Sequence, residues 1–344
     1  MVMDKIDIKN LSKEELGANL KAIGAESYRS VQIMRWLYKV GVKSFDDMTD
    51  LSEELKNKLK AKFHITHLTV SDSKRSPADG TTKYLFKLED SNTIETVFLP
   101  EKARATICLS SQVGCKGACS FCASAPFGFV RNLKSSEILD EVIAVRQKNP
   151  SSPITNLVFM GIGEPFDNYD NVLRAIRILN DKDAFNIGAR RITISTCGII
   201  PGIEALKTEG LQIELSVSLH SAINDVRSKL VPINKKYPIK ELVASCREYT
   251  NATNRVITFE YVLIKDVNCS KIDAEELAKL LKGMKCKVNT ISYNRITKEY
   301  AKPSAKDVSD FMRILKESGI NATHRKSKGE DIDAACGQLR ITRL

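Results

Sequence analysis

From residue 100 onward, short apolar segments typical of strands alternate with amphipathic segments that have the period of helices. This alternation constrains the fold more than any other feature, because strands separated by helices form a parallel sheet that the helices cover. The strands are predicted at 104–111, 154–160, 190–196, 211–220, 255–263 and 287–294. The clearest helices are predicted at 135–148, 170–181, 274–284 and 304–319. The repeats predict an α/β fold whose sheet curves into a partial (β/α)6 barrel.

Three of the predicted strands carry polar side chains along one face. Parallel strands between helices are normally apolar on both faces, so a polar face indicates a lumen that holds a polar ligand. The alternative is a strand face turned to water. The polar positions are Glu214, Ser216, Ser218 and His220 on one strand, Arg191, Thr193 and Ser195 on another, and Thr290, Ser292 and Asn294 on a third.

The first 70 residues or so are predicted to be helical. Ser12 and Glu15 form the pattern of a capping box, and Gly24 is placed to end the helix that follows. A second helix is predicted within 28–41, and a third begins behind Ser52. After them, residues 81–99 alternate in polarity on both sides of 90–92, which predicts a β-hairpin.

Charge and composition limit the partners and the compartment. Among 344 residues, 53 Lys and Arg stand against 42 Asp and Glu, giving a formal charge of +11. The excess favours a polyanion such as nucleic acid, although solubility alone would explain it equally well. No apolar stretch is long enough to span a membrane, and residues 1–15 lack the apolar core of a signal peptide, so a cytoplasmic protein is expected. Cysteines there stay reduced, and close spacing among the nine indicates metal binding or catalysis rather than disulfides.

The segment "CKGACSFC" places Cys115, Cys119 and Cys122 within eight residues. Three thiolates suit a soft metal or an iron–sulfur cluster. They can hold three irons of a cubane and leave the fourth iron open to a substrate. Zinc with a distant fourth ligand and purely structural thiols are the alternatives.

This spacing, with Phe121 just before the last cysteine, resembles the radical S-adenosylmethionine superfamily. The resemblance implies a [4Fe-4S] cluster whose open iron binds S-adenosylmethionine, and reductive cleavage of that cosubstrate to a 5′-deoxyadenosyl radical. It also implies a partial barrel with six repeats. Gly163 and Glu164 in "GIGEP" match the motif that contacts the amino group of the cosubstrate. By the same resemblance its ribose, adenine or carboxylate is contacted by Ser195, Ser218, Leu219, His220 and Asn294.

Further segments are similar to the RNA adenine methyltransferases of the RlmN family and their relative Cfr, over nearly the whole chain. They are "ETVFLP", "SSQVGC", "GFVRNL", "VPINKKYPI" and "GEDIDAACGQL". The resemblance implies methylation of carbon 2 of an adenosine, in the peptidyl-transferase centre of 23S rRNA and in tRNA anticodon loops. An electron donor such as flavodoxin and a monomeric protein are expected with it.

The family chemistry implies roles for three more residues, because adenine carbon 2 is too electrophilic to attack a sulfonium methyl directly. Two S-adenosylmethionine molecules are used per turnover, and the first methylates Cys336. The radical from the second activates that methyl group, which joins the protein to the RNA. Glu95 then removes the ring proton. Cys108 attacks the bridging sulfur, which releases the RNA and leaves a transient disulfide with Cys336.

The sequence periodicity and the family resemblance together predict three parts. They are a helical RNA-binding accessory domain at 1–70, a hairpin linker at 71–100 and a catalytic barrel at 101–344. Cys197, Cys246, Cys269 and Cys286 match nothing functional and are interpreted as ordinary core or surface thiols.

Two departures from the family pattern concern RNA selectivity. Residues 124–129 read "SAPFGF" where "TGQQGF" is common, and the "RITRL" ending lacks the basic tail of some members. Two rival functions stay open: a Cfr-type enzyme that methylates carbon 8, and a non-catalytic zinc-dependent RNA-binding protein.

Overall fold

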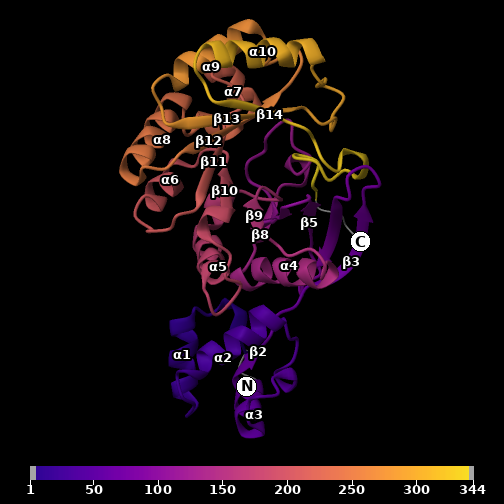
Figure 1. Cartoon of the computed structure of the whole chain (residues 1–344), viewed down its shortest axis with the longest axis vertical. Helices are drawn as coiled ribbons and strands as arrows, with labels where there is room; N and C mark the ends of the chain where they lie inside the picture. Colours follow the sequence, from indigo (N-terminus) through magenta and orange to yellow (C-terminus); the bar gives the residue numbers. More distant parts are fainter. Residues whose placement is uncertain (1–4, 341–344) are drawn as a thin grey trace.

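One curved sheet of ten strands forms the frame of the molecule, in the order β14-β13-β12-β11-β10-β9-β6-β5-β4-β3 (Figure 1). The computed structural model describes residues 5–340, so the first four residues and most of the "RITRL" ending lie outside it. The parallel part consists of β6 (Ala105–Cys108), β9 (Asn156–Phe159), β10 (Ile192–Thr196), β11 (Glu214–Ser218), β12 (Ile257–Leu263), β13 (Cys286–Ser292) and β14 (Ala322–Arg325). All six predicted strands are confirmed. The sheet does not close, as expected for a partial barrel.

The strand β14 was not predicted from the sequence. Its four residues contain no run of apolar β-branched side chains, which is the usual signal for a strand. It forms because the edge of β13 offers unpaired backbone groups, and Val288 to Ile291 pair in parallel with Ala322 to Arg325. This extra strand carries the chain toward the C-terminal segment.

Helices cover the outer face of the parallel strands (Figure 1). They are α4 (Ser135–Lys148), α5 (Tyr169–Asn180), α6 (Ile200–Leu206), α7 (Asn224–Leu230), α8 (Ile239–Thr253), α9 (Lys271–Leu281) and α10 (Ala305–Glu317). The apolar face of each strand packs against them, as Leu215 and Val217 of β11 do with at most 1% exposure. The opposite face is left to line the lumen. No helix in residues 5–340 is long and apolar enough to cross a membrane.

The predicted hairpin is present and extends the barrel sheet. Strands β4 (Thr82–Lys87) and β5 (Thr93–Pro100) are antiparallel, and Ser91 in their turn has φ of 69°. A further strand, β3 (Thr69–Arg75), pairs with β4, and β5 pairs with β6 so that Val97 lies opposite Cys108. The segment thereby belongs to the same sheet as the barrel strands.

The N-terminal helices lie as a small unit at one end of the molecule (Figure 1). Helix α1 (Lys13–Ala22) begins with the predicted capping box of Ser12 and Glu15, and α3 (Glu53–Lys62) is capped by Ser52. The second predicted helix is divided: α2 (Arg29–Met34) continues as a π-helical segment, Arg35–Val40, that ends at Gly41 with φ of 81°. Two short strands, β1 (Ile6–Asp7) and β2 (Phe63–His64), join the beginning and end of the unit.

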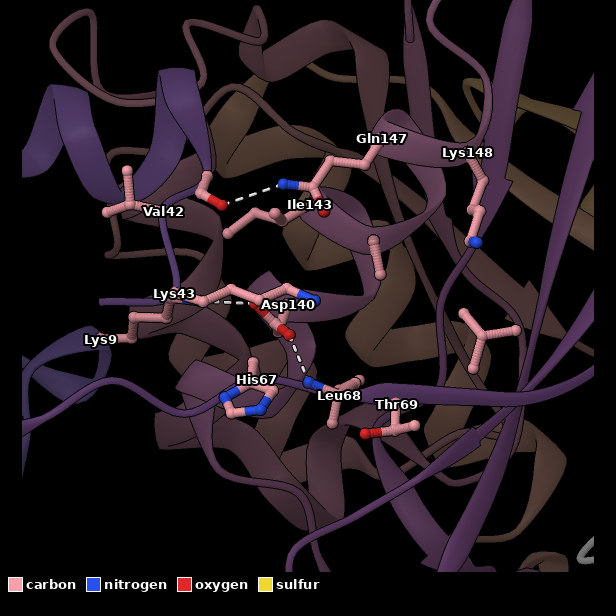
Figure 2. A pocket seen from close by; sticks show the side chains of 13 residues that line it. Lys9, Val42, Lys43, His67, Leu68, Thr69, Asp140, Ile143, Gln147 and Lys148 are labelled. Atoms are coloured by element: carbon pink, nitrogen blue, oxygen red, sulfur yellow. Dashed lines mark hydrogen bonds and ion pairs between the residues drawn. The ribbon is translucent and has the colours of Figure 1, made fainter. Parts of the chain in front are cut away.

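A buried ion pair fastens this unit to α4 of the barrel. Figure 2 shows Asp140 of α4 accepting from Lys9 Nζ at 2.5 Å and from the Leu68 backbone N–H at 2.5 Å. Gln147, two turns along α4, donates to the Gly41 carbonyl oxygen at 2.9 Å. A hollow of about 260 Å³ remains beside these contacts. Lys9 and Asp140 are 1% and 3% exposed, so both charges depend on each other for compensation.

We therefore expect Asp140→Ala to detach the N-terminal unit from the barrel. Removing one partner of a buried pair leaves the other charge uncompensated and costs about 3–5 kcal/mol. Urea unfolding should show the loss, and protease should cleave near residues 65–70 faster than in the wild type. Asp46→Ala, which breaks an exposed pair with Lys60, is the matched control and should change neither measurement. Equal unfolding curves for the two variants would contradict this account of the junction.

Candidate active site

Two adjoining cavities occupy the lumen of the sheet. The larger, of about 660 Å³, is called the lumen cavity and is lined by Cys108, Glu214, Ser216 and Asn289 among others. The smaller, of about 190 Å³, is called the cluster cavity and is lined by Cys115, Cys119, Cys122 and Glu164 among others. The wall shared by both includes Glu260, Arg325 and Cys336. The polar faces predicted for β10 and β11 thus line a polar lumen.

The three clustered cysteines lie on a loop that follows β7 (Gln112–Gly114) directly. A Cβ added at Gly117 would lie 3.4 Å from the Cys115 sulfur and 3.7 Å from the Cys119 sulfur, so the loop folds around a space that a larger residue would fill. Burial raises the pKa of all three thiols, that of Cys115 to about 12. Binding of a metal here must therefore release protons.

The donor set fits an iron–sulfur cluster. Within residues 5–340, no group of three or more His, Cys, Asp or Glu side chains surrounds a single ion. A cubane needs a different arrangement, because each thiolate binds its own iron atom. The residues that could hold it are Cys115, Cys119 and Cys122. All three line one cavity, and each would offer a sulfur ligand.

The "GIGEP" segment reaches the cluster cavity from β9. Gly163 has φ of 111°, and an added Cβ would lie 2.6 Å from the Ser111 hydroxyl oxygen, so the position requires glycine. Glu164 is 4% exposed, and burial raises the pKa of its carboxyl. Its oxygens accept from the Phe166 N–H at 3.0 Å and from the Cys197 N–H at 2.7 Å. These bonds hold the carboxylate on the cavity wall beside the cysteine loop.

The structure changes the interpretation of Cys197. Its sulfur lies 4.0 Å from the Cβ added at Gly117, about as close as the sulfurs of Cys115 and Cys119, and it lines the same cavity. Its carbonyl oxygen accepts from the fully buried Arg227 at 2.7 Å. Cys197 is therefore part of the site rather than an ordinary thiol. A signal existed in the sequence, because it follows Thr193 and Ser195 on the same alternating face.

Ser195, Ser218, His220 and Asn294 all line the cluster cavity, as their strand positions predicted. His220 has φ of 59°, which is uncommon outside glycine and turns the ring out of the strand line. Its Nδ1 accepts from the Val262 N–H at 3.0 Å, and burial lowers the pKa of the imidazole to about 3. The ring is neutral at physiological pH and packs edge-on against Phe121.

One predicted contact residue and two predicted inward-facing residues of β13 lie elsewhere. Leu219 is completely buried in the apolar core and lines neither cavity, and its backbone N–H donates to the Glu260 carbonyl oxygen at 3.0 Å. On β13 the prediction of the inner face was wrong. Thr290 and Ser292 hydrogen-bond His324 of β14, whereas Asn289 and Ile291 face the lumen. The physical reason is that β14, absent from the prediction, gives the polar residues of β13 a partner away from the lumen.

The C-terminal segment brings Cys336 over the lumen. The chain is fixed there by Asn294 Nδ2, which donates to the Cys336 carbonyl oxygen at 3.1 Å, and by the Ser124 hydroxyl, which donates to that of Leu339 at 2.7 Å. Cys336 is exposed because it faces the cavities, and Cys108 of β6 lines the lumen cavity with it. Burial raises the pKa of the Cys108 thiol, and the charge of a neighbouring Cys336 thiolate raises it further. All nine cysteines are free, so the expected disulfide is not formed in this structure.

Glu95 of β5 is 3% exposed and lines neither cavity. Its Oε1 is 3.1 Å from Lys83 Nζ, and its Oε2 accepts from the Arg340 backbone N–H at 2.9 Å. It lies on the same face of β5 as Val97, which pairs with Cys108. The C-terminal segment therefore covers a carboxylate whose strand position aims it at the lumen.

Comparisons with known proteins agree with this geometry. Residues 6–65 match the family model "Ribosomal RNA large subunit methyltransferase N-terminal domain", and residues 109–280 match the radical SAM superfamily. Over 335 residues, covering 97% of each chain, the protein is 45% identical to a probable dual-specificity RNA methyltransferase RlmN of Clostridium novyi. It is 46% identical to a relative of the same description from a Thermotoga species, over 98% of each chain. A crystal structure of a radical SAM methyltransferase from Sphaerobacter thermophilus superposes with a TM-score of 0.93 at 44% identity, covering 97% of this chain and 99% of that one.

Proposed function

The chain belongs to the RlmN family of radical SAM RNA methyltransferases, and from this premise we propose that it methylates carbon 2 of an adenosine in 23S rRNA and in tRNA. It is an RNA methyltransferase with a radical SAM fold, which removes the non-catalytic zinc protein as an alternative. The description "dual-specificity" carried by its relatives supports more than one RNA substrate.

We assign Cys115, Cys119 and Cys122 to a [4Fe-4S] cluster and the adjoining wall to S-adenosylmethionine. Gly163 and Glu164 would receive the amino group, and the remaining polar contacts would come from Ser195, Ser218, His220 and Asn294. When bound, the cluster and S-adenosylmethionine supply the methyl group and the one-electron chemistry that activates it. A neutral His220 suits this position, because it adds no second positive charge beside a sulfonium.

The chain's own residues perform the remaining steps. The Cys336 thiol loses its proton and accepts the methyl group as a thioether. After one hydrogen atom of that methyl has been removed, its carbon is joined to adenine, and the unpaired electron left on the adduct would return to the one-electron acceptor held by Cys115, Cys119 and Cys122. Glu95 takes the proton that leaves the ring. The Cys108 thiolate then attacks the Cys336 sulfur, so that an S–S bond forms, the S–C bond breaks, and the released carbon takes up a proton to become the methyl group.

The observation that carries this proposal is the placement of two thiols from distant parts of the chain on one cavity wall. Cys108 comes from the first barrel strand and Cys336 from the C-terminal segment, and both line the lumen cavity next to the cysteine loop. For Glu95 to act, the bond to the Arg340 N–H must open, because it covers the carboxylate. We propose that the incoming nucleotide displaces this part of the C-terminal segment. The N-terminal unit and the net charge of +11 support binding of the surrounding RNA.

An anaerobic assay with S-adenosylmethionine, dithionite and fragments of 23S rRNA or tRNA tests the proposal. Mass spectrometry of the digested nucleosides should find 2-methyladenosine in both RNAs. Cys119→Ala is the control: it should bind clearly less iron and form no methylated product, because one of three cluster anchors is missing. Methylation at carbon 8 would instead place the chain with Cfr-type activity, and product from an iron-free Cys119→Ala protein would overturn the radical mechanism.

A further inference from the structure

An exposed apolar patch lies on the outer side of the cysteine loop. Phe127, Phe129 and Val130 are 44%, 36% and 53% exposed, on the loop and strand β8 (Phe129–Asn132) that follow the cluster cysteines. Seven large apolar side chains are exposed in residues 5–340, and three of them fall within these four positions. None of the three lines the lumen cavity or the cluster cavity. The concentration at one place indicates a contact surface rather than scattered surface residues.

The patch is fastened to the first cluster cysteine. Strands β7 and β8 pair, and the Cys115 backbone N–H donates to the Gly128 carbonyl oxygen at 2.9 Å. The packing is tight, since a Cβ added at Gly114 would lie 2.0 Å from that same oxygen. The surface at Phe129 is therefore connected to Cys115 by one hydrogen bond and a few covalent bonds.

Two lysines lie beside the patch. Lys116 Nζ lies over the Phe129 ring at 4.3 Å from its centroid, and Lys116 and Lys236 both act electrostatically on Asp167. Lys116 and Lys236 are exposed, and neither forms an ion pair with any residue in 5–340. Arg131 by contrast is neutralised by Asp90 and Glu137. An apolar centre with an unpaired basic rim fits a protein partner with an acidic face.

We propose that this patch, Phe127, Phe129 and Val130 with the rim of Lys116 and Lys236, is the docking surface for a small acidic electron-carrier protein. The proposal rests on the function proposed above, in which an electron must enter the cluster. One electron passes from the reduced carrier to the cluster held by Cys115, and no covalent bond is made or broken. Electron-transfer encounters need only a small interface, which suits a patch of this size. RNA is the alternative occupant, and the experiment below measures its affinity separately.

Reduced flavodoxin is the probe, and the cluster-loaded protein without RNA is the sample. We expect Val130→Glu and Lys236→Glu each to slow cluster reduction by flavodoxin by about tenfold or more at low salt, through lost apolar contact or lost steering. The reaction is followed by the loss of cluster absorbance in a stopped-flow instrument. Reduction by dithionite, RNA affinity and dithionite-driven methylation should stay at wild-type values. Ile272→Glu on α9, an even more exposed apolar position at 64%, is the matched control and should change nothing.

Two outcomes would overturn the docking surface. Unchanged flavodoxin rates in both variants would remove it, and so would a loss of RNA affinity without a loss of flavodoxin rate, which would make the patch an RNA-stacking surface. If Val130→Glu also slowed cluster reduction by dithionite, the substitution would have disturbed β8. The flavodoxin rate of Lys236→Glu would then decide whether the docking surface is correct. If the wild type failed to methylate RNA with dithionite, the proposed function would be contradicted. The docking surface would still be tested by the rate at which flavodoxin reduces the cluster, because that measurement uses no RNA.

Discussion

Cys336→Ala should make no methylated RNA and should form no covalent protein–RNA complex. The thiol is the carrier of the methyl group, and no other exposed cysteine in residues 5–340 faces the lumen to replace it. We expect a loss of more than about 10⁴-fold, as for removal of a covalent nucleophile elsewhere. Nucleoside mass spectrometry measures the product, and denaturing gels with labelled RNA measure the complex.

The variant should still bind iron and cleave S-adenosylmethionine, because Cys115, Cys119 and Cys122 are untouched. Cys286→Ala, a partly buried thiol at the start of β13 outside both cavities, is the matched control and should methylate normally. A slow-migrating band with Cys336→Ala would remove this residue as the methyl carrier.

Cys108→Ala should stall one step later, with RNA attached to the protein. Cys336 can still be methylated and joined to adenine, but no thiolate remains to attack the bridging sulfur. Denaturing gels should show a slow, nuclease-sensitive band that accumulates to about one RNA per active protein, with turnover reduced as far as in Cys336→Ala. In the wild type, burial raises the pKa of Cys108, so a larger thiolate fraction at higher pH should speed release of the RNA.

Glu95→Gln gives an independent check on the same intermediate. The amide keeps the shape of the side chain but cannot take the ring proton, so the same band should accumulate with turnover reduced by about 10²–10⁴-fold. Normal turnover by Cys108→Ala would mean that another group releases the RNA. Absence of the band in Glu95→Gln would place the proton acceptor elsewhere.

The sequence by itself determined the elements that local pattern controls. The alternation between strand-like and helix-like spacing of apolar residues located six strands to within a few residues. The Ser12–Glu15 pair located the start of α1. Both signals are local, because periodicity and capping depend on neighbours in the chain. The spacing of Cys115, Cys119 and Cys122 located the cluster loop for the same reason. The polar faces of β10 and β11 were sufficient to predict a polar lumen, since alternate residues on a strand share a face.

Tertiary structure decided what depends on residues distant in sequence. Strand β14 has too little apolar pattern to be predicted and exists because β13 has a free edge, and this pairing in turn reversed the expected face of Thr290 and Ser292. The buried Lys9–Asp140 pair joins residues 131 positions apart, and Arg340 covers Glu95 from 245 positions away. Cys197 joined the site only because β10 ends beside the cysteine loop. Such contacts leave no local pattern, because the free energy that forms them comes from the meeting of two surfaces rather than from either segment alone.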